Sequence, residues 1–220
     1  MKRALLASGI IASLIYVAAN LISPMYFPGY DWMSQTVSEL SAIGAPSRVI
    51  WLAFIFPFGV FVTLFGLGVW AEADGKRSLR IVGGALVVHG VVGLSWPPMH
   101  LRGSEFTLTD ALHIAFTAVT VPLMVIQMSF GAVAFGLGFR VYTVLSIVVL
   151  LGFGIITGVQ SPNIASNLPT PYIGVWERMS IAAYMLWLAV FAISLLVNER
   201  RSKGVRELSR KRHAPQRHAS

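Results

Sequence analysis

The stretch that decides the fold begins with SWPPMHLRG at residues 95–103 and ends with DALH at residues 110–113. Long apolar runs precede and follow it, so it is a polar connection between two hydrophobic helices. It brings two histidines, an arginine and a carboxylate to one end of those helices. We therefore expect the candidate site of this chain to lie at that end.

The composition is that of a protein embedded in a bilayer. Hydrophobic residues make up 55% of the 220 residues and charged residues only 12%, whereas soluble domains carry about 25% charged residues. A soluble fold of this length could not bury so much apolar surface. The chain has no cysteine, which excludes disulfides, thiolate metal sites and a cysteine nucleophile.

Hydropathy predicts an all-α fold, a polytopic bundle of six transmembrane helices within residues 1–197. The first apolar run follows two basic residues and resembles a signal peptide, but it is long enough to span a bilayer, so we expect an uncleaved first helix. Residues 198–220 are basic, lack hydrophobic periodicity and predict a disordered cytoplasmic tail. The expected spans are residues 4–22, 49–70, 81–96, 111–135, 139–159 and 177–197.

A short amphipathic helix is also predicted between the first two spans, over Met33–Ile43. Its apolar residues recur at positions 33, 37, 40 and 43, while serines and a glutamine occupy the opposite face. The segment is too short to cross a bilayer. We expect it to lie along the outer membrane surface.

The basic residues predict how the chain is oriented. Six spans place both termini on one side, and only Arg48, Arg102 and Arg178 of the 17 Lys and Arg residues fall on the other side. The positive-inside rule then places both termini in the cytoplasm and the protein in the cell membrane. The net charge of +8 therefore reflects topology and not nucleic-acid binding. Membrane lipids are the expected partners, with anionic headgroups at the basic tail.

The residues that could carry chemistry are predicted to cluster at the outer face. Asp110 and His113 are three residues apart, which places them on one face of the fourth span. A carboxylate there can fix a histidine tautomer and leave the second ring nitrogen for a proton or a metal. His100 and Glu39 are predicted to complete this catalytic cluster. The predicted substrate-binding residues are Arg102, His89 and Trp96.

Each of these residues also has a purely structural explanation. The TLTD sequence before the fourth span resembles a capping box, so Asp110 could simply cap that helix. His113 and His89 could be buried histidines that bond neighbouring helices, and Arg102 could contact a lipid phosphate. Trp96 fits an aromatic belt. A divalent metal is the one cofactor that these side chains could hold, and nothing in the sequence indicates haem, nucleotide or flavin.

Three segments together resemble a known family. They are SQTVSELSAIGAP at residues 34–46, PMHLRG at 98–103 followed by DALH at 110–113, and GVWER at 174–178. Their order and their placement relative to the spans are similar to those of the six-span integral membrane proteins grouped as domain-of-unknown-function family nine-nine-eight. The resemblance covers residues 4–197 and implies an integral membrane protein without an established reaction.

A weaker likeness relates His100, Asp110 and His113 to the membrane hydrolases that include alkaline ceramidases, which hold a metal with histidines and an aspartate. This chain departs from that pattern because no later span contains a His-x-x-x-His pair. Two functions stay open. The favoured one is a lipid-binding, sensing or assembly factor with a polar outer-face pocket. The alternative is a membrane-embedded hydrolase or transferase that acts on a lipid or isoprenoid headgroup, and a transporter ranks third because polar residues thin out along the spans.

Overall fold

The computed structural model describes the backbone of residues 2–213 and the side chains of residues 2–200, and the described chain is all-α. Six helices are long and apolar enough to cross a membrane, so the predicted six-helix bundle is confirmed. The third helix begins four residues earlier than predicted, at Arg77, and the last begins at Ile173. The six are α1 (Lys2–Ile22), α2 (Arg48–Glu72), α3 (Arg77–Leu94), α4 (Leu108–Ala132), α5 (Leu137–Gln160) and α7 (Ile173–His213).

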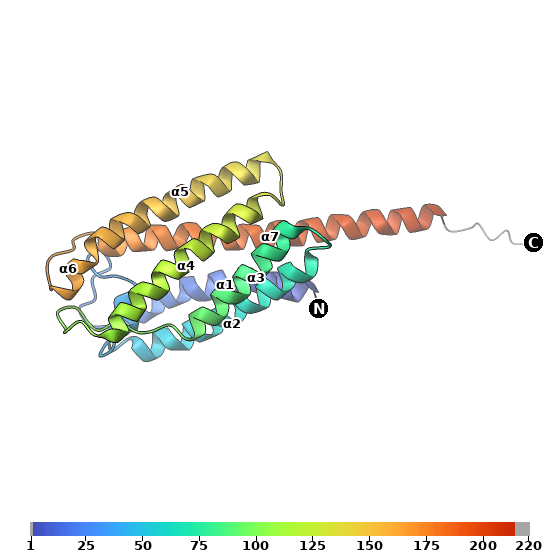
Figure 1. The fold of residues 1–220 in the computed structure, drawn as a ribbon. Coiled ribbons are helices and arrows are strands. Elements are labelled where there is room, and N and C mark those ends of the chain that lie inside the picture. The colour runs from blue at the N-terminus through green and yellow to red at the C-terminus, as the bar shows by residue number, and fades with distance from the viewer. Residues whose placement is uncertain (1, 214–220) are drawn as a thin grey trace, which may run out of the picture.

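The bundle is arranged around α7 (Figure 1). This helix packs against α1 on one side and α5 on the other, α2 lies between α1 and α3, and α4 packs mainly on α3. The aromatic side chains of α7 fill the core, where Tyr184, Trp187 and Phe191 are fully buried. Because the helices are connected as antiparallel neighbours, the chain changes direction only at the two ends of the bundle.

Glycine lets α2 and α3 approach closely. A Cβ atom added at Gly66 would lie 2.8 Å from the carbonyl oxygen of Gly83, which is closer than real Cβ contacts. Small residues at helix interfaces are how membrane helices gain packing contacts without a hydrophobic drive between them. The contact fixes α3, and with it the connection from α3 to α4 that carries the candidate site.

The two ends of the bundle differ in kind. One, here called the loop end, carries the long connections at residues 23–47, 95–107 and 161–172. The other, the termini end, carries the start of α1, the short connections at residues 73–76 and 133–136, and α7, which extends beyond the bundle (Figure 1). Ion pairs link helices at the termini end: Lys2 with Glu72 at 3.6 Å and Arg3 with Glu199 at 3.5 Å.

The amphipathic helix predicted over Met33–Ile43 is not formed. The segment contains one 3-10 turn, η2 (Ser38–Ser41), and it folds across the loop end with Val37 and Leu40 buried. The reason is local competition, because serine and threonine side chains bond the backbone in non-helical conformations. The Thr36 and Glu39 side chains bond each other's backbone N–H, at 3.2 and 2.7 Å, which starts a turn that does not propagate.

The tail at residues 198–220, predicted to be disordered, is helical as far as the structure describes it. Helix α7 continues through this segment to His213, and residues 214–220 lie outside the described chain. Extending a formed helix needs no new nucleus, and the segment is rich in Arg, Lys, Glu and Leu, which are good helix formers. The first proline after Ile173 is Pro215.

Candidate functional site

The loop end is built from three connections that bond one another through their backbones. The N–H of Ile43 donates to the Met99 carbonyl at 2.8 Å, and the N–H of Gly174 donates to the Met33 carbonyl at 2.9 Å. The N–H of Gly103 donates to the Ile164 carbonyl at 3.3 Å. Irregular backbone at membrane depth is tolerated only when its polar groups are satisfied within the protein. These bonds therefore fix the frame in which the candidate residues stand.

Asp110 caps α4 and orients a histidine, but that histidine is His100. The predicted capping box is present, with the N–H of Thr107 donating to Asp110 Oδ2 at 2.9 Å. The same carboxylate accepts the backbone N–H of His100 at 2.7 Å and lies 2.9 Å from its Nδ1. The carboxylate thus holds the loop and fixes the His100 tautomer with Nδ1 protonated.

His113 makes a separate set of contacts, none of which involves Asp110 as a hydrogen-bond partner within the described residues. Its Nδ1 lies 2.8 Å from the Pro97 carbonyl and 3.1 Å from the indole nitrogen of Trp96. One ring nitrogen cannot donate to a carbonyl and accept from an indole at once. The shorter contact assigns the proton to Nδ1, which leaves Nε2 facing the Ser38 hydroxyl at 3.3 Å.

Ser38 and Glu177 join His113 at this position, and the sequence reasoning missed both. The Ser38 hydroxyl donates to Glu177 Oε1 at 3.1 Å, and the backbone N–H of Val37 donates to Glu177 Oε2. The signal that could have found Glu177 is a carboxylate placed just inside the last apolar span, where an ionised group is costly without partners. Ser38 carried no such signal.

Glu39 is fully buried and pairs with Arg102, which lies 3.3 Å from it. The guanidinium also donates to the Ser34 carbonyl at 2.9 Å, the Leu168 carbonyl at 3.1 Å and the Thr170 hydroxyl at 2.8 Å. Arg102 therefore ties three loop segments together, and its charge is balanced by a buried carboxylate. It is a structural clamp, and the same geometry leaves it few donors for a substrate.

The other two arginines of the loop end are clamps as well. Arg48 donates to the Ser41 carbonyl at 2.7 Å. Arg178 donates to the Trp32 carbonyl at 3.0 Å and to the Tyr30 hydroxyl at 2.6 Å, and it lies over the Trp32 ring at 4.2 Å. Burial raises the pKa of Tyr30, so its hydroxyl stays protonated and donates to the Thr36 carbonyl at 2.7 Å.

His89 lies apart from the other candidates. Its Nδ1 is 3.1 Å from the Tyr184 hydroxyl and 3.4 Å from Gln127 Nε2, within a buried group from α3, α4 and α7. It is seven residues before Trp96, roughly 10 Å along a helix. The structure therefore does not bring His89 to the loop-end residues, and polar contacts of this kind join membrane helices.

The predicted four-residue cluster is divided into pairs. His100 is with Asp110, His113 is with Ser38, and Glu39 is with Arg102. Within the described residues, no three His, Asp or Glu side chains come close enough to hold a metal ion. The Trp96 ring packs edge-on against His113 at 5.6 Å.

A hollow of about 400 Å³ opens beside Arg102 at the loop end. On one wall, Asp31 is exposed and anionic, because a hydrogen bond from the Ser34 hydroxyl lowers the pKa of its carboxyl group. Arg102 also lines the hollow and is paired with Glu39. The hollow is lined by Gly29, Asp31, Ser34, Gln35, Arg102, Pro169, Thr170 and Pro171.

This chain is a multi-span membrane protein, and comparison with known proteins assigns its family. The family model described as "Protein of unknown function (DUF998)" matches residues 10–194. The chain belongs to that family, as the three motifs indicated. No curated protein and no solved structure matches it.

Proposed function

We propose that this protein is a lipid-binding, sensing or assembly factor of the cell membrane that receives a polar lipid headgroup in the loop-end hollow. The observation that carries the proposal is the charge of that hollow. Asp31 contributes an exposed carboxylate, while the one cation of the lining, Arg102, is already paired with Glu39. A headgroup that ends in an ammonium, such as ethanolamine or choline, is complementary to this charge.

The size and the rigidity of the hollow support the same function. Small-molecule sites typically measure about 300–1,000 Å³ and have few, fixed polar groups; a hollow of about 400 Å³ is enough for a headgroup. Arg102 bonds Ser34 on one wall and Thr170 on the other. The walls therefore keep their separation without a ligand, which lowers the entropic cost of binding.

The variant Asp31→Asn tests the proposal. Asparagine keeps an oxygen for the Met33 N–H, which Asp31 accepts at 3.1 Å, but removes the charge. Native mass spectrometry of detergent-purified protein with added phosphatidylethanolamine should show roughly fivefold weaker binding, as expected for one exposed ion pair. Glu105→Gln, an exposed acid outside the hollow, is the matched control and should bind as wild type does. Equal binding by Asp31→Asn and wild type would exclude the hollow as the headgroup-binding site.

Orientation is a separate part of the proposal. The loop end faces outward and both termini face the cytoplasm, because the loop-end cations are only Arg48, Arg102 and Arg178. Since the chain has no native cysteine, single cysteines at Ser104 and Asp74 report the two ends directly. A membrane-impermeant maleimide should label Ser104→Cys in intact cells and Asp74→Cys only after lysis. The reverse labelling pattern would mean that the termini end faces outward and the loop end faces the cytoplasm.

A second candidate is a hydrolase that acts on a lipid ester, and the Ser38–His113 contact favours it. His113 Nδ1 is anchored on the Pro97 carbonyl and Nε2 faces Ser38 Oγ at 3.3 Å, which is the arrangement of a nucleophile beside an oriented base. The Ser38 hydroxyl donates to Glu177 in the structure, so it would first turn to His113 Nε2. Ser38 Oγ would then attack the ester carbonyl carbon while His113 Nε2 takes its proton. His113 would return that proton to the departing alcohol, and water would then release the acyl group from Ser38.

A fluorophosphonate probe separates this candidate from binding alone. If Ser38 is a nucleophile, peptide mass spectrometry should find the probe on Ser38, and His113→Ala should abolish labelling. Ser41→Ala is the matched control, because Ser41 is in the same turn and its hydroxyl contacts only the Ser38 carbonyl, at 2.9 Å. Absence of probe on Ser38 in folded protein would leave headgroup binding as the only function proposed here.

A further inference from the structure

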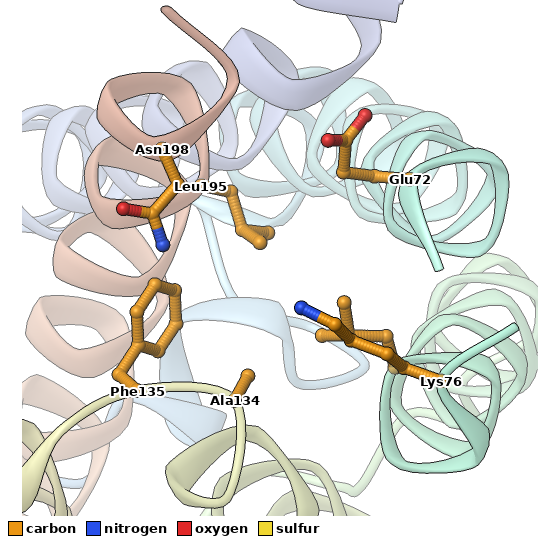
Figure 2. Close-up of a pocket in the computed structure, with 7 residues that line it drawn as sticks. Glu72, Lys76, Ala134, Phe135, Leu195 and Asn198 are labelled. Atoms are coloured by element: carbon orange, nitrogen blue, oxygen red, sulfur yellow. The ribbon is translucent and has the colours of Figure 1, made fainter. Parts of the chain in front are cut away.

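A second cavity, of about 210 Å³, lies at the termini end (Figure 2). It lies between the connection from α2 to α3, the turn from α4 to α5, and the last turns of α7 before the helix leaves the bundle. The lining residues are Glu72, Lys76, Leu79, Ala134, Phe135, Leu195 and Asn198. It is at the opposite end of the helices from the loop-end hollow.

The base of this cavity is apolar and rigid. Leu79 and Leu195 are 3% and 4% exposed and belong to the main core. Phe135 packs against Phe191 at 5.8 Å and against Phe139 at 4.6 Å, which holds the α4–α5 turn in place. The cavity is therefore formed partly by the packed core and partly by the two short connections at residues 73–76 and 133–136.

The polar side chains of the cavity divide into one that is paired and two that are not. Glu72 is bonded to Lys2 at 3.6 Å. Lys76 extends across the cavity towards Phe135 and Asn198, as Figure 2 shows. Within residues 2–200 neither the Lys76 ammonium nor the Asn198 amide makes an ion pair or a side-chain hydrogen bond. They present a cation and an amide donor together, above an apolar base.

We propose that this cavity binds the phosphate of an anionic phospholipid from the leaflet at the termini end, with Lys76 pairing with the phosphate and Asn198 donating to it. The volume accommodates a headgroup and not a whole lipid, so the acyl chains would lie outside the bundle along the helices. The neighbouring basic residues favour an anion at this depth. They are Arg77, Arg80 and Arg140.

A phospholipid is favoured over free phosphate because of where the two polar groups stand. Both side chains lie at the ends of apolar spans, α3 and α7, where headgroups are found. Phe135, which is only partly buried, would contact the glycerol and upper acyl carbons, whereas an inorganic ion has no apolar part to contact it. This inference does not depend on the proposed function, since it involves the other end, other residues and the opposite ligand charge.

Lys76→Gln tests the inference with Arg140→Gln as control. Both changes remove one positive charge at the termini end, but Arg140 does not line the cavity. Native mass spectrometry of the full-length protein with phosphatidylglycerol should show about fivefold weaker binding for Lys76→Gln, from roughly 1 kcal/mol per basic residue near the surface, and Lys76→Arg should restore it. Arg140→Gln should change binding much less.

Three results would overturn the inference. Equal losses in Lys76→Gln and Arg140→Gln would mean general attraction to a basic surface. Equal binding of phosphatidylglycerol and phosphatidylcholine by the wild type would mean that the headgroup charge is not recognised. Thermal stabilisation by millimolar inorganic phosphate equal to that given by phosphatidylglycerol would mean a free-anion site. Lys76 is exposed, so its variants should fold, and a thermal melt of each variant without lipid verifies this.

Discussion

The loop-end hollow and the termini-end cavity lie at opposite ends of the same helices, and they differ in charge and in the state of their polar groups. In the hollow, Arg102 pairs with Glu39 and donates to groups of two other loop segments, and Asp31 is left as the exposed charge. In the cavity, Lys76 and Asn198 make no side-chain hydrogen bond within residues 2–200. We therefore propose an ammonium ligand for the hollow and a phosphate ligand for the cavity.

Connection length explains this difference. The loop end must satisfy the backbone of long irregular connections, and each of its three arginines donates to carbonyl groups of those connections. The termini end turns within residues 73–76 and 133–136, so it has little irregular backbone to satisfy. The arginines of the loop end are therefore used to satisfy backbone carbonyls, whereas Lys76 at the termini end makes no ion pair within residues 2–200.

The largest effect that should distinguish the ends is the loss of the Arg102 clamp. Arg102→Ala leaves Glu39 buried without its counter-charge, and breaking one partner of a buried pair costs about 3–5 kcal/mol. Lys76→Ala, which removes a cation at the termini end, should be nearly neutral. Thermal unfolding in detergent measures both. A loss for Lys76→Ala as large as that for Arg102→Ala would contradict the distinction between the ends.

A smaller effect should follow from a methyl group at Gly174. Its Cβ would lie 2.2 Å from the Gln35 carbonyl oxygen, where α7 begins against the loop. Backbone must shift to admit it, which we expect to cost about 1–3 kcal/mol. Gly138→Ala at the termini end has nothing within 4 Å of the new Cβ and should not destabilise the protein. The two variants are compared by the same thermal melt. Equal melting temperatures would mean that the backbone around Gln35 moves to accommodate the methyl group at little cost.

The smallest effect is expected from Asp110→Asn. The asparagine keeps one oxygen for the Thr107 N–H but weakens the contacts with His100, so we expect a loss of about 1 kcal/mol. Because Asp110 is not hydrogen-bonded to His113 in the described chain, its variant should leave any fluorophosphonate labelling of Ser38 intact. Labelling that falls as far as in His113→Ala would show that the carboxylate serves His113 after all.

Local features of the loop end could be predicted from the sequence, and distant pairings could not. Asp110 and Thr107 are three residues apart, and their capping box was visible as a spacing. The pairing of Arg102 with Glu39 spans 63 residues, and that of Glu177 with Val37 spans 140. Such contacts depend on how three irregular connections fold over one another, for which neither hydropathy nor periodicity gives a signal.

The fold was easier to predict from the sequence than the site, because few structures can cross a bilayer. Six apolar runs of sufficient length can only be helices when they cross a membrane, since every backbone group must be satisfied internally. The same reasoning fails outside the spans. It predicted a helix over Met33–Ile43 from apolar spacing alone, whereas the Thr36 and Glu39 side chains bond the backbone of a single turn there.

The most direct test of the proposed function is a zero-length crosslink between Asp31 and an amine headgroup. A carbodiimide activates the carboxylate, and the primary amine of phosphatidylethanolamine then forms an amide with release of the activated group. In bilayer nanodiscs of phosphatidylethanolamine and phosphatidylglycerol, peptide mass spectrometry should find the lipid adduct on Asp31 well above Glu105, the exposed acid of the neighbouring connection. Adducts on Glu105 equal to or above those on Asp31 would contradict the account, because the hollow would then hold no amine headgroup.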